Sequence, residues 1–150
     1  MALPVLGWKE RASLPDWGIT GLRVKLDTGA RTSAIHVAEM ERVDEHRLED
    51  QILPVLALTV PLSRREPDRR IRVTAPVIGY KRVRDTSAKA ECRPVVRTRL
   101  VCGPIDTEID ITVTDRSGMI FRMILGRHAL AGRAVVDPNR GYTTGPEPHR

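Results

Sequence analysis

The sequence predicts a mostly β protein, and three observations lead to this fold class. Apolar residues recur at every second position in stretches such as 22–26 and 109–113, which is the periodicity of a strand with one buried face. Hydrophobic residues make up 41% of the chain but aromatic residues only 3%, so the core has to be built from Val, Leu and Ile, which favour strands. Eleven Gly and eleven Pro supply many turns.

The chain of 150 residues corresponds to one domain, which we expect to span 1–145 and to be followed by a flexible tail at 146–150. Proline, glycine and charged residues separate its elements, and Pro54 and Pro61 indicate an interrupted edge. We expect strands at 5–17 (broken at 14–16), 21–26, 32–40, 52–62, 71–75, 95–101, 107–114, 119–125 and 134–136. We expect a charged hairpin or loop at 39–50, turns at 63–70, 103–104, 115–118 and 137–139, and one helical turn at 127–131.

Composition restricts the compartment and the partners. The net charge is +6 and the pI about 10.0, which favours nucleic acid, ribosomes or acidic peptides as partners. No apolar stretch is long enough to span a membrane, and residues 1–11 lack the pattern of a secretory signal. Cys92 and Cys102 do not make a disulfide framework, so we expect a cytoplasmic protein.

One short stretch carries the first functional signal. The alternating strand that ends at Leu26 is followed at once by Asp27, Thr28, Gly29 and Ala30. Gly29 permits a tight turn, so the Asp27 carboxylate would be held rigidly at the end of a strand. The alternative is an ordinary turn in which Asp27 only hydrogen-bonds its own backbone.

A second motif favours the functional interpretation. Residues 121–127 form an apolar stretch that ends in Leu125, Gly126 and Arg127. An early Asp-Thr-Gly and a late Ile-Leu-Gly-Arg together resemble the retropepsin-like aspartic proteases. Residues 25–36 are similar to the opening signature of a bacterial group labelled ATP-dependent zinc proteases, and residues 93–98, 121–127 and 136–138 match its other hallmarks. The resemblance covers the chain from about 7 to about 145.

The resemblance implies a closed β-barrel that works as a homodimer without a cofactor. Peptide hydrolysis of this type needs two carboxylates that share one proton, and Asp27 of a second copy would supply the other. Thr28 would hydrogen-bond across the two-fold axis, and Gly29 would offer its carbonyl to the substrate backbone. Leu125, Gly126 and Arg127 would support the loop. The usual acidic partner of Arg127 is missing because Arg31 stands there, so Asp137 or the C-terminal segment could replace it.

The same resemblance implies a substrate. Such proteins are associated with a glutamate ligase that adds glutamate tails to a ribosomal protein, and the peptidase would trim those tails. Ala30 and Arg31 would line the cleft, and residues 79–93 would form a flap with its tip at 84–89. Arg82 and Arg84 on that flap would attract carboxylates. Alternatively, Arg31 forms an internal ion pair and residues 79–93 are a mobile, solvated hairpin.

Three rival functions stay open. A basic β-barrel could bind RNA or the ribosome without catalysis, although few aromatic residues are present for base stacking. The fold could also serve as a dimeric scaffold with an inactive site. A zinc peptidase is the least favoured, because neither a His-Glu-x-x-His run nor a Cys-x-x-Cys pair occurs, and His36, His46, His128 and His149 lack ligand spacing. A phosphate-binding loop for ATP is also lacking.

Overall fold

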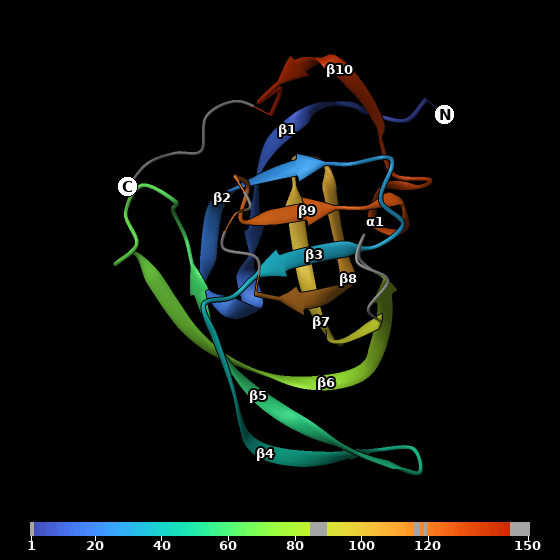
Figure 1. The fold of residues 1–150 in the computed structure, drawn as a ribbon. Helices are drawn as coiled ribbons and strands as arrows, with labels where there is room; N and C mark the ends of the chain where they lie inside the picture. The colour runs from blue at the N-terminus through green and yellow to red at the C-terminus, as the bar shows by residue number, and fades with distance from the viewer. Residues whose placement is uncertain (1, 85–89, 116–117, 119, 145–150) are drawn as a thin grey trace.

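The structure is a computed structural model that describes residues 2–84, 90–115, 118 and 120–144. Its strands are joined in one ten-stranded sheet, which confirms the mostly β prediction (Figure 1). The strands are β1 (Val5–Leu14), β2 (Ile19–Leu26), β3 (Ser33–His36), β4 (Glu39–Leu48), β5 (Gln51–Pro61), β6 (Arg70–Arg84), β7 (Ala90–Cys102), β8 (Ile105–Thr114), β9 (Met123–Leu125) and β10 (Val135–Gly141). A 3-10 turn, η1 (Pro15–Trp17), and a short helix, α1 (Arg127–Leu130), complete the described elements.

Part of the sheet curls into a ring of strands. The order is β10-β1-β2-β9-β3-β8-β7-β6-β5-β4, and β1 also pairs with β7 where Ser13 lies opposite Val101. The ring therefore consists of β1, β2, β9, β3, β8 and β7 in that order, and the pairing of β7 with β1 joins its two ends. In Figure 1, β5 and β4 extend away from this ring at the bottom of the view, and β10 lies at the top. A closed barrel and a homodimer stay predictions.

The core is aliphatic, as the composition predicts. Strand β2 shows the expected alternation, because Leu22, Val24 and Leu26 are buried while the residues between them are exposed. Similar rows from β1, β5, β7 and β8 join them in one continuous hydrophobic cluster. The buried face of β2 therefore anchors the strand that leads into Asp27.

Three sequence predictions need adjustment or refinement. The strand predicted at 119–125 is shorter, because β9 is only Met123–Leu125 and Ile120 is 65% exposed. The turn predicted at 137–139 lies inside β10, where the amide of Asn139 donates to Asp137 Oδ1 and the register against β1 shifts. The local hydrogen bond therefore produces an irregularity within the strand and does not end it. The charged segment at 39–50 is the hairpin of β4 and β5, and β4 is an exposed edge strand.

Among the described residues, no helix has the length and apolar character needed to cross a membrane.

Candidate functional site

The Asp loop, residues 27–32, joins β2 to β3 next to α1 (Figure 1). Strand β2 runs parallel to β9, with Leu26 opposite Leu125. The amide of Asp27 continues this ladder by donating to the carbonyl of Leu125 at 2.8 Å. Leu125 is fully buried, so the backbone just before the carboxylate is fixed to the core of the ring.

Inside the loop, a tight turn orients the Asp27 carboxylate. The amide of Gly29 donates to Asp27 Oδ1 at 2.9 Å, and the amide of Ala30 donates to the carbonyl of Asp27 at 3.2 Å. Within the part of the chain that the structure describes, no hydrogen bond or ion pair engages Oδ2 of Asp27. The carboxylate is half-buried, so one oxygen is held in place and the other is available.

The late Gly126 packs against the far end of the Asp loop. A Cβ atom placed on Gly126 would lie 2.5 Å from the carbonyl oxygen of Thr32, so only glycine fits without a backbone shift. The amide of Gly126 donates to the hydroxyl of Ser33 at 3.1 Å, and both groups are buried. The two predicted motifs therefore meet in space, although almost one hundred residues separate them.

Arg127 braces the Asp loop through backbone atoms. Its Nη1 donates to the carbonyls of Thr28 at 3.0 Å and Gly29 at 3.3 Å. Its own amide donates to the carbonyl of Ala30 at 2.8 Å. Of the two suggested partners, Asp137 forms an ion pair with Arg140 at 3.2 Å instead, and residues 145–150 of the C-terminal segment lie outside the described residues.

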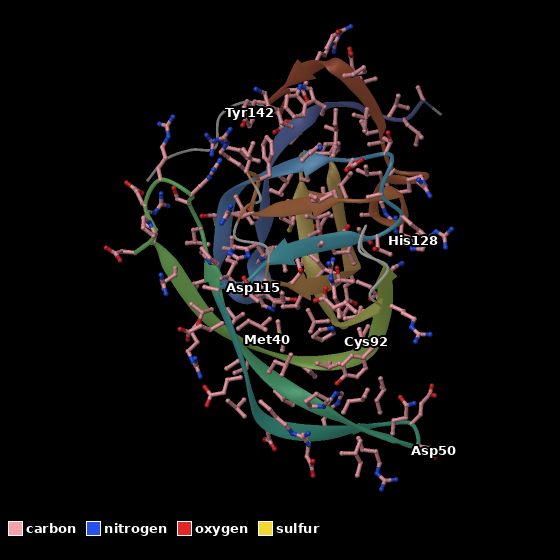
Figure 2. All side chains as sticks on the ribbon, viewed as in Figure 1. Met40, Asp50, Cys92, Asp115, His128 and Tyr142 are labelled. Carbon is pink, nitrogen blue, oxygen red and sulfur yellow. The ribbon has the colours of Figure 1, made fainter. Side chains whose placement is uncertain are left out.

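A groove of about 830 Å³ lies beside the Asp loop. The base of the β6–β7 hairpin, α1 and β8 form its walls, and the lining includes Thr32, Tyr80, Lys81, Arg82, Arg97, Asp110, His128 and Arg133. Asp27 is not part of this lining, and the groove meets the Asp loop at its far end, at Thr32. His128, labelled at the right of Figure 2, belongs to α1.

The predicted substrate-binding residues have different surroundings. Arg82 lines the groove. Arg31 is exposed, and its carbonyl accepts a hydrogen bond from the amide of His128 at 3.1 Å. The ion pairs found among the described residues do not include Arg31. The backbone of Arg84 pairs with that of Ala90, whereas its side chain and the predicted flap tip at 85–89 lie outside the described residues.

Sequence reasoning missed three residues of this region. Ser33 holds Gly126, Thr32 lies against it, and His128 lines the groove. The signal for His128 was present, because it directly follows the Gly-Arg that ends the late motif. Thr32 and Ser33 could not be singled out, since their role depends on the approach of a distant strand.

The chemistry that this arrangement offers is that of a single positioned carboxylate. Among the described residues, no group of three or more His, Cys, Asp or Glu is gathered closely enough to hold a metal ion. A lone carboxylate can accept a proton from water, but amide cleavage also needs an acid to protonate the leaving nitrogen. The site in one chain therefore offers half of an acid–base pair.

Comparisons with known proteins point in a consistent direction. The model of a protein family described as "Retropepsin-like aspartic endopeptidase RimB" matches residues 5–147. A protein named probable alpha-L-glutamate ligase from Parasynechococcus marenigrum is 33% identical over 144 residues, and one with the same name from Desulfotalea psychrophila is 32% identical over 140 residues. These alignments cover 94% and 92% of this chain but only 29% of each relative, so the chain spans less than a third of the curated relatives it matches.

A solved structure has a similar fold. The crystal structure of the protein Lpg0085 from Legionella pneumophila, described as having unknown function, is 26% identical with a TM-score of 0.73. The match covers 95% of this chain and 99% of that protein. The similarity in fold therefore extends over nearly the whole chain.

Proposed function

Because the chain belongs to the RimB-like family of retropepsin-like aspartic endopeptidases, we propose that it hydrolyses peptide bonds with Asp27 from each of two protomers. The observation that carries the proposal is the fixed Asp27 carboxylate. Its backbone is bonded to Leu125, its Oδ1 to Gly29, and its Oδ2 has no partner among the described residues. An ordinary Asx turn would also give the bond from Gly29 to Oδ1, so the support lies in that bond together with the contacts that the late motif makes to the Asp loop.

In the proposed mechanism, two Asp27 side chains face each other across a two-fold axis and share one proton. The ionised carboxylate takes a proton from a bound water, whose oxygen attacks the carbonyl carbon of the scissile bond. At the same time, the protonated carboxyl gives its proton to the carbonyl oxygen, which forms a tetrahedral intermediate with two hydroxyls. When the C–N bond breaks, the proton taken from water passes to the leaving nitrogen, and the other carboxylate recovers its proton from one hydroxyl of the intermediate, so the pair again holds one proton.

Neighbouring groups of the loop would support this chemistry. The hydroxyl of Thr28 would bond across the axis to the partner's loop. The carbonyl of Gly29 accepts only a long bond from Arg127, at 3.3 Å, and retains a lone pair for a substrate amide. Arg127 would thereby position the loop in both protomers without touching the substrate.

We propose a glutamate-rich protein tail as the substrate, in a cytoplasmic setting. The support is the positive charge beside the site, where Arg31 is exposed and Lys81 and Arg82 line the groove. The relatives named as glutamate ligases support the same substrate class, because a peptidase that is joined to such a ligase would act on its product. A ribosomal protein carrying such a tail, and a separate ligase, are the proposed partners.

The test compares the wild-type protein with Asp27→Asn on a protein that carries a polyglutamate tail. We expect the wild type to shorten the tail, as seen by mass spectrometry, and the variant to fold normally but to leave the tail intact. Asp68→Asn is the matched control, because Asp68 is an exposed carboxylate in the loop before β6. Cleavage by Asp27→Asn at the wild-type rate would refute the mechanism.

The dimer is tested separately by sedimentation. A protein that cleaves while it is monomeric at the assay concentration cannot use two copies of Asp27. Specific activity should therefore rise with protein concentration until the dimer is fully formed.

A further inference from the structure

A second charged surface lies on β1 and β2, on strands that precede the Asp loop. Lys9 and Arg11 of β1 lie directly opposite Lys25 and Arg23 of β2 in the antiparallel ladder. Like charges in opposite positions destabilise a sheet. The ion pairs found among the described residues involve other arginines, so these four cations have no carboxylate to compensate them there.

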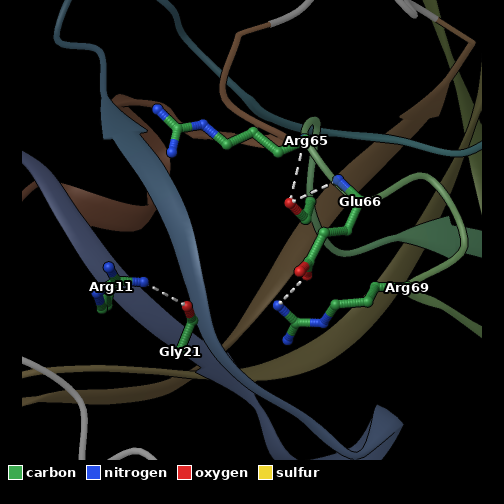
Figure 3. A network of polar contacts seen from close by, with 6 residues as sticks. Arg11, Gly21, Arg65, Glu66 and Arg69 are labelled. Carbon is green, nitrogen blue, oxygen red and sulfur yellow. Dashed lines mark hydrogen bonds and ion pairs between the residues drawn. The ribbon is translucent and has the colours of Figure 1, made fainter.

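The contrast with neighbouring cations is visible in Figure 3. Arg69, in the loop between β5 and β6, forms an ion pair with Glu66 at 3.1 Å. Arg11 donates instead to the backbone carbonyl of Gly21 at 3.2 Å, which fixes the side chain but leaves its charge uncompensated. The positive charge of β1 and β2 is thus held in place rather than neutralised.

Tyr142 connects three of the four cations. Its ring centroid lies 5.4 Å from Lys9 Nζ and 5.4 Å from Arg11 Cζ, and its hydroxyl accepts a hydrogen bond from Arg23 Nε at 2.9 Å. The backbone of Tyr142 has a φ of +54°, a conformation that costs about 1–3 kcal/mol for a residue other than glycine. Strained residues of this kind are frequent at functional sites.

Two more rings border this surface. Lys9 Nζ lies 5.1 Å from the ring centroid of Trp8, and Arg23 Cζ lies 5.4 Å from that of Phe121. Gly141 leaves room for Lys9, because a Cβ there would lie 2.7 Å from Lys9 Cε. Three of the five aromatic residues of the chain therefore gather around these cations, on a chain that has very few.

Internal stability alone does not account for this cation–aromatic face, which we define as Lys9, Arg11, Arg23, Lys25 and Tyr142. An exposed cation–π contact stabilises by about 0.5–1 kcal/mol, which is similar to the cost of a like-charge cross-strand pair. The four contacts together contribute about 2–4 kcal/mol, which offsets the two like-charge pairs and the strained backbone of Tyr142 and leaves little net stabilisation. What remains is a positive surface with planar groups, and its Tyr142 lies at the top of the view in Figure 2, apart from His128 at the right.

We propose that the cation–aromatic face binds single-stranded RNA. RNA offers phosphates to the four cations and unpaired bases that stack on aromatic rings and on guanidinium planes. An acidic peptide would use the charges but would have no use for the rings. This inference is independent of the proposed peptidase activity, because none of the five residues belongs to the Asp loop or lines the groove.

Binding of a fluorescein-labelled oligouridylate, followed by anisotropy at several salt concentrations, tests the proposal. We expect Lys9→Gln/Arg11→Gln to weaken binding at least tenfold. The slope of log K against log salt should fall by about 1.4, since each lost contact with a single strand contributes about 0.7. Thermal melting will establish that the variant is folded.

The matched control is Arg42→Gln/Arg47→Gln, which removes the same charge from β4 at the opposite end of the sheet. We expect this control to bind within about twofold of the wild type, and Asp27→Asn to bind as the wild type does. Equal losses in both double variants would overturn the proposal, since net charge alone would then drive binding. The proposal would also be overturned if Lys9→Gln/Arg11→Gln lost affinity for a polyglutamate peptide but not for RNA.

Discussion

Nη1 of Arg127 lies 3.0 Å from the carbonyl oxygen of Thr28, so the late motif holds the Asp loop by its backbone. A carboxylate partner for Arg127 is therefore unnecessary, and a side chain such as Arg31 can occupy the place where one would stand. The bond from Arg127 to Gly29 adds a second anchor on the same nitrogen. The loop conformation thus depends on a residue that is itself exposed.

Replacing Arg127 with Ala should reduce peptidase activity at least tenfold while the fold is retained. A hydrogen bond from a charged donor contributes about 1.5–3 kcal/mol, and its loss would release the loop rather than the core. The measurement is kcat/KM together with the melting temperature. Arg47→Ala, on the exposed β4, serves as the control. Full activity in Arg127→Ala would mean that the loop keeps its shape without this brace.

Gly126→Ala should destabilise the protein by about 1–3 kcal/mol, because the new Cβ would meet the backbone of Thr32 at 2.5 Å and a backbone cannot rotate away. Urea unfolding measures the difference. Gly79→Ala is the matched control, since a Cβ on Gly79 has no atom within 4 Å. Similar stabilities for the two variants would contradict the tight contact between the two motifs.

The hydrogen bonds to the Glu10 carboxylate lead us to expect that the protein loses stability in acid. Burial by itself raises the pKa of this carboxyl, but hydrogen bonds from Thr143, Gly7 and Thr144 outweigh it, so the pKa is lowered from 4.5. A lowered pKa in the folded state stabilises the protein above the unfolded value, and this contribution disappears as the pH falls below about 4.5.

The comparison is between the wild type and Glu10→Gln, unfolded in urea at several pH values. At pH 7 we expect the variant to be less stable by about 1–3 kcal/mol, because buried donors lose their charged acceptor. The difference should shrink between pH 5 and pH 3. Glu39→Gln, at an exposed position, should follow the wild type throughout. A difference that does not change with pH would show that the charge of Glu10 is irrelevant.

Arg31→Ala should weaken binding of a glutamate-tailed peptide about tenfold, or 1.4 kcal/mol, and that of a neutral peptide much less. The exposed guanidinium beside the Asp loop is free to pair with a carboxylate, and Arg does so with two parallel bonds. The Kd of both peptides for the Asp27→Asn background would be measured, so that cleavage does not interfere. Equal losses for the two peptides would refute a role in charge selection.

The elements that the sequence predicted correctly are those with an unambiguous period or a strong turn. Leu22, Val24 and Leu26 alternate because one face of β2 is buried, and this is visible without the fold. The predicted strand at 119–125 was too long because β9 pairs with β2 and β3 over only three residues, which no local pattern reports. Asp137 and Asn139 did form the expected local hydrogen bond, but inside a strand.

The sequence indicated the candidate-site residues that are adjacent along the chain and missed those that meet only through the fold. Asp27, Gly126 and Arg127 stand in two recognisable motifs, and the structure brings these motifs together. Ser33 and Thr32 acquire their contacts only because Gly126 arrives beside them. The gathering of Tyr142 with cations of β1 and β2 likewise depends on a C-terminal segment whose position the sequence does not indicate.

The free edge of β4 has a consequence for how molecules of this protein behave when crowded. Its backbone is paired on one side only, and along Glu39–Leu48 four acidic side chains outnumber two arginines. A second copy that approached to extend the sheet would bring the same acidic row against itself. Repulsion between these carboxylates therefore opposes edge-to-edge association of the exposed β4–β5 hairpin into fibrils. Neutralising them would make such association easier.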